Sequence, residues 1–463
     1  MTTEAATLHG GLCPATAGQS AGESRLHRLA GFFTEASRSL TVALGFAIPV
    51  STSLTEGLLV LLLICWLLSG DYAGRLRQIR GNPVAVWALV LLAVYAVGVT
   101  YSSAALWEAG DTLFTYRKLL YVAVFLTVFS DAPTRERAMA AFVLAMLVTL
   151  VASLLMWPGL LASKWGMPDN CAYFKSHIDQ NTMMAFFVAV LANRALATSR
   201  YRWLTIAVIL IAGYNILFMV DGRTGYLILF ALICLVLFQK KGIRGLAAAG
   251  ALILGLSAVA YTCSSEFRTR VDLAVGEARD YYLEGRNTLD SSIGQRLAFY
   301  KASLDVAAKS PLIGAGTGSF RNEYEQRTTV RRDPPVCYPH SEYFSALVQT
   351  GLIGLGVFLY WLYVQWTCCK RALPHLAPLA QALIVTFAVG SLVNSFMTHT
   401  AIGFLYCYFL GLCFADMRTS GSQPAAHGPG AHEAIPEVSG AEARLASPAG
   451  RSDLAGLEHA SSP

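Results

Sequence analysis

Charged side chains are scarce in this chain of 463 residues. Asp, Glu, Lys and Arg make up 14% of it, whereas they make up about 25% of a typical soluble domain. Hydrophobic residues make up 55% of the chain. This balance excludes an ordinary soluble enzyme, a disordered protein and a disulfide-rich secreted module. It indicates an integral membrane protein that crosses the bilayer many times.

Strong charge and clustered cysteines are also missing. The formal net charge of +6 is too small for a dedicated nucleic-acid binder, so we expect no nucleic-acid partner. The ten cysteines show no C-x-x-C spacing, and most lie inside apolar runs, where cysteine behaves as a small hydrophobe. The cysteines therefore predict no metal site.

The apolar runs are the main feature that is present. They are continuous rather than alternating, which favours membrane helices of about 20 residues over the strands of a barrel. We predict an all-α polytopic fold with about twelve transmembrane helices. Their approximate limits are 38–52, 54–70, 83–101, 115–131, 138–157, 182–199, 203–220, 225–239, 245–262, 342–366, 376–395 and 401–416.

These runs divide the chain into five parts. Residues 1–37 and 417–463 are polar and rich in Ala, Gly and Ser, and we predict that both are disordered tails. The first tail has no apolar core of signal-peptide length, so we expect no cleavage. Helices 1–9 occupy 38–262, a large loop occupies 263–341, and helices 10–12 occupy 342–416.

The Lys and Arg residues of the short loops predict the orientation. With the N-terminus inside, the inner loops carry twelve of these residues and the outer loops carry five. Both tails are therefore predicted to be cytoplasmic, and the loop 263–341 is predicted to be periplasmic. The twelve inner residues are Arg75, Arg77, Arg80, Arg135, Arg137, Arg200, Arg202, Lys240, Lys241, Arg244, Lys370 and Arg371. The five outer residues are Arg117, Lys118, Lys164, Lys175 and Arg223.

The large loop is expected to be partly helical. Apolar residues recur at helical spacing over 291–309, and Pro311 ends the pattern. The glycines of 314–318 favour a tight turn over a phosphate cradle, because no strand–helix unit surrounds them. The outer segments contain neither Asp-x-Asp nor His-Glu-x-x-His, and Glu323 with Glu325 suits a helix surface better than a metal site. We therefore predict no metal and no cofactor.

Three arginines are candidates for binding an anionic group. Arg223 lies in a very short outer turn, where the positive-inside bias disfavours a basic residue. Arg270 follows the ninth apolar run, and Arg296 lies on the predicted loop helix beside apolar residues. The planar guanidinium suits bidentate phosphate binding. The alternative for Arg223 is snorkelling at the interface, paired with Asp221.

His340 is the candidate general base. It lies where the large loop re-enters the membrane, and an unperturbed histidine pKa of about 6.5 suits proton transfer near neutral pH. A helix-capping or interfacial role is the alternative. His177 and His399 are also on the predicted outer side but have no comparable basic surroundings.

These residues resemble the O-antigen ligase family. His340-Ser341, nine residues and then Gly351 match its signature, although Ser replaces the commoner Asn after the histidine. Arg223 in Gly-Arg-Thr-Gly, Arg296 in Gln-Arg-Leu-Ala and, with weaker flanking support, Arg270 resemble the arginines of the family. The resemblance extends over about residues 38–416.

The resemblance implies a membrane glycosyltransferase of the bacterial inner membrane, active on the periplasmic face. The donor would be a glycan on undecaprenyl pyrophosphate, the acceptor the lipid A–core oligosaccharide, and the product lipopolysaccharide. Arg223, Arg270 and Arg296 would hold the pyrophosphate. His340 would accept a proton from the acceptor, and one displacement without metal would invert the anomeric carbon.

Other functions remain open from sequence. An O-antigen polymerase or a protein O-oligosaccharyltransferase would have the same fold and a similar donor. A twelve-span transporter is a non-enzymatic alternative, although we find no internal repeat of the kind typical of transporters. Membrane lipids are expected partners in every case. Pairing among Cys171, Cys263 and Cys337 in the oxidising periplasm is also open.

Overall fold

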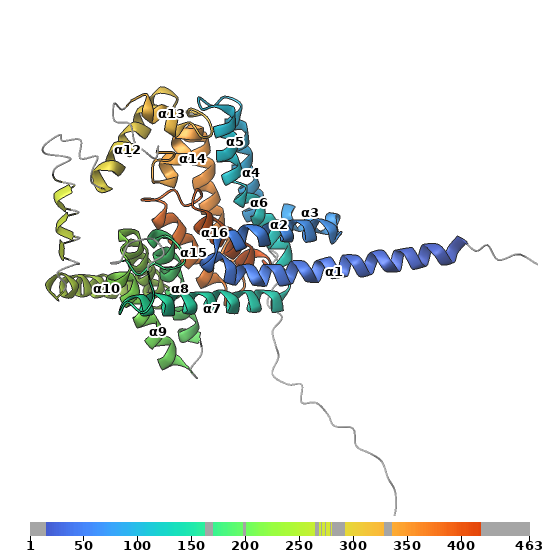
Figure 1. The fold of residues 1–463 in the computed structure, drawn as a ribbon, viewed down its shortest axis with the longest axis horizontal. Coiled ribbons are helices and arrows are strands. Elements are labelled where there is room, and N and C mark those ends of the chain that lie inside the picture. Colours follow the sequence, from blue (N-terminus) through green and yellow to red (C-terminus); the bar gives the residue numbers. More distant parts are fainter. Residues whose placement is uncertain are drawn as a thin grey trace, which may run out of the picture. The chain divides into compact units, whose positions relative to one another are not determined.

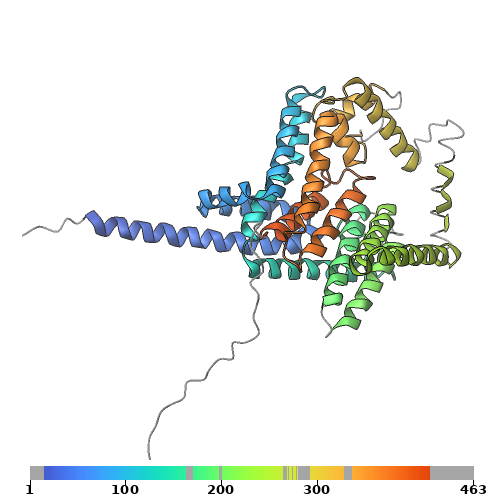
Figure 2. The ribbon, with the colours of Figure 1, turned by 180° about the vertical axis from the view of Figure 1, so that it is seen from behind.

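Helices form nearly all of the regular structure. The computed structural model describes residues 15–162, 170–197, 201–263, 268–269, 271–273, 275–277, 279, 292–327 and 336–417, and no strand occurs in them. The side chains of 15–26 and of a few other residues in these ranges are outside this description. The described helices are α1 (Ala15–Val50), α2 (Thr52–Leu68), α3 (Tyr72–Arg80), α4 (Pro83–Val99), α5 (Leu106–Thr115), α6 (Lys118–Val128), α7 (Ala132–Met156), α8 (His177–Ala197), α9 (Arg202–Tyr214), η1 (Asn215–Met219), α10 (Arg223–Cys263), α12 (Ser292–Lys309), α13 (Phe320–Glu325), α14 (Glu342–Cys368), α15 (Ala377–Gly390) and α16 (Thr400–Phe414) (Figures 1 and 2).

Local signals in the sequence fix where several helices begin. Ser51 caps α2 and accepts a hydrogen bond from the Leu54 N–H at 3.3 Å, directly after the break that Pro49 introduces. The Asn82 side chain caps α4 by accepting from the N–H of Val84 at 3.0 Å, with Pro83 as the first helical residue. These are the residue types that satisfy the unpaired N–H groups of a first helical turn.

The first helix is longer than the sequence predicts. Helix α1 begins at Ala15, so residues 15–37 are helical rather than part of a disordered tail. Two side-chain hydroxyl groups that could compete for backbone hydrogen bonds instead bond to carbonyl groups of the preceding helical turn. The side chains of Thr34 and Ser37 donate to the carbonyls of Ala30 and Phe33, each at 2.8 Å. Composition alone missed this because Ala, Leu and Arg are also strong helix formers.

Helix α10 contains the turn predicted between two apolar runs. Gly242 has φ 56° and ψ −139°, a backbone conformation that a side chain would strain. A Cβ on Gly245 would collide with the carbonyl oxygen of Leu237, so the chain turns back sharply here. The predicted runs 225–239 and 245–262 therefore lie on either side of a real break.

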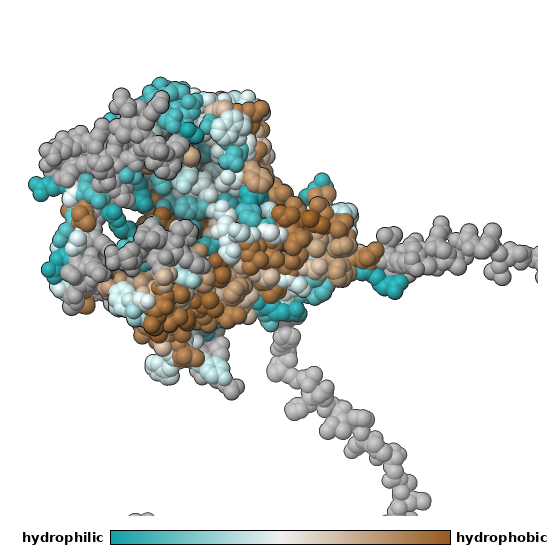
Figure 3. All heavy atoms as spheres, in the orientation of Figure 1, coloured by the Kyte–Doolittle hydropathy of each residue, from teal (hydrophilic) through white to brown (hydrophobic). Residues whose placement is uncertain are grey.

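The described helices include several that can cross a bilayer. By length and composition, four qualify in the described residues: α7, α9 with η1, α10 and α14. Helices α2 and α3, bent by 113° at their junction, form a fifth if they count as one span, and α4, α15 and α16 are apolar but shorter. In Figure 3, hydrophobic residues cover the surface over α7, α9 and the α1–α2 region. Trp203 on α9 is 82% exposed. The chain is an integral membrane protein.

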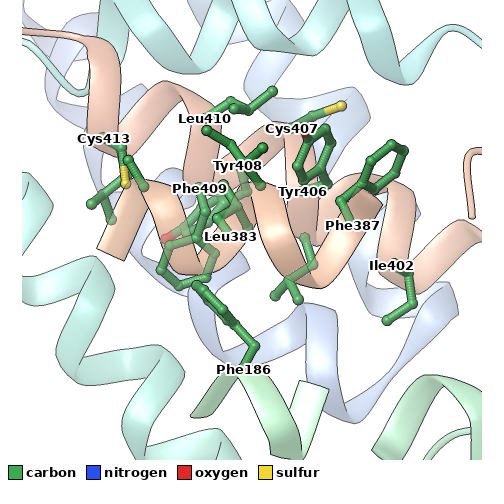
Figure 4. Packing of buried hydrophobic residues seen from close by; sticks show 14 of the residues in the cluster. Phe186, Leu383, Phe387, Ile402, Tyr406, Cys407, Tyr408, Phe409, Leu410 and Cys413 are labelled. Carbon is green, nitrogen blue, oxygen red and sulfur yellow. The ribbon is translucent and has the colours of Figure 1, made fainter. Parts of the chain in front are cut away.

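Helix α16 lies at the centre of the packing. Every residue from Ala401 to Phe414 is buried. The Tyr406 ring stacks on Phe387 of α15 with centroids 3.8 Å apart, and Phe409 packs edge-on against Phe186 of α8 at 4.9 Å (Figure 4). A helix that is apolar all round belongs inside a bundle. It holds α8 and α15 in place, and its own N-terminus reaches the candidate site.

Candidate active site

The N-terminal ends of four helices converge at one end of the bundle. Asp179 in the first turn of α8 bonds to His399, the N-cap residue of α16. The first turn of α10 lines a cavity with the start of α8, and Glu342 begins α14 beside the chain that leads to α16. Helix N-termini carry partial positive charge, which favours an anion among them.

Arg223 and Arg296 line the same cavity. It has a volume of about 270 Å³ and also contains His177, Asp221 and Thr224. The structure therefore brings together two of the three predicted arginines, from α10 and from the loop helix α12. Arg270 lies outside the described residues.

The two guanidinium groups influence each other. Burial lowers the pKa of Arg296, and the charge of Arg223 lowers this pKa further, while Tyr300 and Glu277 raise it. Arg223 is 3.7 Å from a carboxylate oxygen of Glu277, and its side chain is 40% exposed. An anion in the cavity would relieve the repulsion between the two guanidinium groups.

His340 adjoins this arginine pair through α12. Its ring lies 5.8 Å from Phe299 and 5.1 Å from Tyr338, centroid to centroid. Burial, with the nearby charges of Arg296 and His399, lowers the pKa of His340 to about 4. At neutral pH the imidazole is therefore neutral and retains a lone pair that can accept a proton.

The backbone at His340 is strained. Its φ is 56°, a left-handed conformation that costs a non-glycine residue about 1–3 kcal/mol when the surrounding structure enforces it. The next two residues are tied to the chain after α15. The hydroxyl of Ser341 and the N–H of Glu342 both donate to the Ser391 carbonyl, at 3.1 and 2.9 Å. These bonds fix the direction in which the imidazole leaves the chain.

Gly351, the glycine of the histidine signature, lies where the backbone of another segment approaches α14 closely. Gly351 interrupts α14 with φ 63°, and a Cβ there would collide with the backbone of Leu312. The N–H groups of Leu352 and Ile353 donate to the carbonyls of Pro311 and Leu312, at 2.8 and 3.1 Å. The loop after α12 therefore inserts into the break in α14, which couples the helix of Arg296 to the helix that follows His340.

The glycine string at 314–318 forms a turn, as expected. The N–H of Ala315 donates to the Val348 carbonyl at 2.7 Å, and the N–H of Gly316 donates to the Gln349 carbonyl at 3.0 Å. The N–H of Gly318 donates to the Gln349 side chain at 2.9 Å. These donors are used inside the protein, so they do not form a phosphate cradle.

Residues 391–399, which we call the return segment, join the parts of the site. The Tyr300 hydroxyl of α12 donates to the Leu392 carbonyl at 3.0 Å. The Asn394 amide donates to the hydroxyl of Thr224 on α10 at 2.9 Å, and Ser395 is bonded to Ser345 of α14 at 2.9 Å. The segment thus links the helices of Arg296 and Arg223 to the one that follows His340.

Two buried side chains, Lys118 and Glu342, hold the return segment at Met397. The Lys118 ammonium donates to the Met397 carbonyl at 2.7 Å, and the Met397 N–H donates to a Glu342 carboxylate oxygen at 3.0 Å. Each of the two charged residues is 1% exposed. Met397 is therefore held at both its N–H and its carbonyl group.

Sequence reasoning ranked His177 and His399 below His340 and did not single out Asp179. His399 Nδ1 lies 2.9 Å from Asp179 Oδ1, and both side chains are largely buried. His177 lines the arginine cavity. The available signal was their position at the outer ends of apolar runs, but only the fold shows that these ends meet.

Other predicted features of the outer segments also have structural outcomes. Glu325 forms a helix-surface ion pair with Arg321 at 3.1 Å, whereas Glu323 forms a largely buried ion pair with Arg327 at 2.6 Å. Among the described residues, no group of three or more His, Cys, Asp or Glu side chains can hold a metal ion. Cys171 is a buried free thiol, Cys337 is exposed, and the Cys263 side chain is outside the description.

A family model matches the central part of the chain. Residues 206–359 match the family model for O-antigen ligase. The matched region contains Arg223, Arg296, His340 and Gly351, whereas the return segment lies beyond it. No curated protein matches the chain.

Proposed function

Because residues 206–359 carry an O-antigen ligase domain, we propose that the protein transfers a glycan from undecaprenyl pyrophosphate to the lipid A–core oligosaccharide, completing lipopolysaccharide. Members of this family are membrane glycosyltransferases that use lipid-linked glycans. One observation carries the proposal: two arginines share a cavity of about 270 Å³, and a neutral, half-buried histidine lies near Arg296. That arrangement suits an anionic leaving group and an acceptor hydroxyl side by side.

The arginines would bind the donor. Arg223 and Arg296 each present a planar fork that matches two phosphate oxygens, and Arg270 is the proposed third member of the set. A sugar pyrophosphate is already a good leaving group. The guanidinium groups stabilise the negative charge that grows on it as the bond to the anomeric carbon breaks.

His340 would activate the acceptor. Its neutral imidazole takes the proton of an acceptor sugar hydroxyl while that oxygen forms the new bond to the anomeric carbon. The bond from this carbon to the pyrophosphate breaks in the same step, and undecaprenyl pyrophosphate leaves. A single displacement inverts the configuration at the carbon. The scheme needs no metal and no cofactor.

The proposed setting is the bacterial inner membrane, with the site on the periplasmic face. The charge bias of the short loops predicts that both termini are cytoplasmic. Helices α8, α14 and α16 all begin at the site, as their predicted direction requires. We keep twelve spans as the proposed topology, and they fall on α1, α2, α4, α6, α7, α8, α9 with η1, the two halves of α10, α14, α15 and α16.

In vitro transfer tests this function directly. Purified protein is given lipid-linked glycan and one of three acceptors: lipid A–core, a second lipid-linked glycan or a periplasmic acceptor protein. We expect product only with lipid A–core, and equally in excess EDTA. Transfer to the second glycan would make the protein a polymerase, and transfer to protein would make it an oligosaccharyltransferase. Loss in EDTA that only Mg²⁺ or Mn²⁺ restores would refute the arginine scheme.

A further inference from the structure

A larger cavity lies at the other end of the helices that form the site. Its volume is about 540 Å³, and it is lined by the first turns of α7, the last turns of α8 and the chain between α14 and α15. Helix α8 runs from His177 at the site to Ala197, and its 21 residues span about 30 Å. This distance matches the hydrocarbon thickness of a bilayer, so the cavity lies near the membrane surface opposite the site.

The cavity combines a basic rim with an apolar wall. Arg135, Arg194 and His375 line it together with one acid, Glu136. The rest of the lining is mostly apolar and includes Met139, Val190 and Leu379.

The two arginines have different surroundings. Arg135 is 8% exposed, donates to the Phe129 carbonyl at 2.5 Å and lies 3.6 Å from Asp416. Arg194 is exposed, and it forms no ion pair with any side chain in the part of the chain that the structure describes. One guanidinium is thus held in place by the protein, and the other is available to an external anion.

We propose that this cavity binds the headgroup of an anionic phospholipid. Its phosphodiester would lie between Arg135 and Arg194, and an acyl chain would follow the apolar wall at Met139 and Leu379. A basic pocket between transmembrane helices at the membrane surface has the charge and the depth that suit such a headgroup. The apolar wall favours a lipid over free phosphate, which has no part that could cover it.

Lipid competition tests the proposal independently of transfer activity. Full-length protein in nanodiscs of mixed phosphatidylcholine and phosphatidylglycerol is released and analysed by native mass spectrometry for bound lipid. We expect retained phosphatidylglycerol on the wild type. Arg194→Gln changes an exposed position and should leave folding intact. It should lower the affinity of the protein for phosphatidylglycerol about five-fold, because one arginine near an anionic lipid contributes about that much. Arg135→Gln should lower it further if the variant folds.

Matched controls separate a site from general surface charge. Arg137→Gln removes an exposed arginine on α7 that does not line the cavity, and it should leave lipid retention unchanged. Equal retention of the two lipids, or an equal loss in Arg137→Gln, would overturn the proposal. Inorganic phosphate or soluble glycerophosphoglycerol could also displace the bound lipid as effectively as phosphatidylglycerol does. That result would show that the apolar wall contributes nothing to binding, and it would overturn the proposal.

Discussion

At the scale of single residues, the protonation of His340 decides what the site can do. The sequence indicates a histidine with an ordinary pKa, but burial and two cationic neighbours lower its pKa to about 4. A base with a low pKa is neutral over a wider range of pH and is intrinsically weaker. In the proposed mechanism the arginine pair would compensate for the weaker base, because it would make the pyrophosphate easier to displace.

The acid side of the pH–rate profile should show this depressed pKa. The pH dependence of kcat/KM reports the free enzyme, and His340 accepts a proton only when it is neutral. The pKa of His340 is lowered to about 4. Activity should therefore persist well below pH 6.5 and fall only as the pH approaches this pKa. Measuring kcat/KM from pH 4 to pH 8 provides the test. A fall in kcat/KM centred near pH 6.5 would mean that burial and neighbouring charges do not lower the pKa of His340.

Arg223 tests whether a fork or only a charge is needed. Arg223→Lys keeps the charge but loses the planar fork of N–H donors that can bind two phosphate oxygens. Turnover should therefore fall about 10- to 100-fold with folding unchanged. Arg223→Ala should be at least as severe. Transfer rates and thermal stability of both variants give the answer. Near-normal activity in both variants would mean that Arg223 only snorkels at the membrane interface, a role that its 40% exposure also allows.

At the scale of elements, the break in α14 connects the signature glycine to the site. Gly351→Ala adds a Cβ at φ 63° and against the Leu312 backbone, which should destabilise the protein by about 1–3 kcal/mol or more. Gly356→Ala is the matched control on the same helix. It has nothing within 4 Å of the new Cβ, so it should be neutral or stabilising by up to about 1 kcal/mol. Thermal unfolding in detergent compares the two variants, and equal stability would refute the close approach.

The elements themselves were largely predictable from sequence. The loop helix expected over 291–309 is Ser292–Lys309, and the turn expected between 239 and 245 falls at Gly242. These features follow from local periodicity and from glycine or proline positions, which act within a few residues. The helical extension of α1 was missed because its composition resembles that of a tail.

The return segment could not be predicted, because its role depends on distant contacts. Nothing near Met397 in the sequence indicates that Lys118 and Glu342 will bond to the two ends of that residue. His399 and Asp179 are equally far apart along the chain and become partners only when α8 and α16 pack together. Residue type and family resemblance led to the candidate histidine and arginines, whereas the contacts that bring Arg223, Arg296 and His340 near one another could not be predicted in the same way.

At the scale of the whole molecule, orientation in the membrane is the largest prediction still to be tested. The loop that carries α12 and α13 should be periplasmic. In a Cys337→Ser background, Glu325→Cys places a thiol on an exposed position of α13. It should react with a membrane-impermeant reagent in intact spheroplasts, whereas Arg137→Cys on α7 should react only after permeabilisation. The reverse pattern would invert the topology and move the site to the cytoplasm.

The most direct test of the account is the turnover of folded His340→Ala, measured with its donor affinity. Loss of a positioned general base should lower the transfer rate by about 10²–10⁴-fold. Donor affinity should stay within a few-fold of the wild type, because Arg223 and Arg296 remain in their cavity. Turnover retained within a few-fold would show that His340 is not the base. A collapse of donor affinity together with turnover would instead make the histidine part of the pyrophosphate site and contradict the division of labour proposed here.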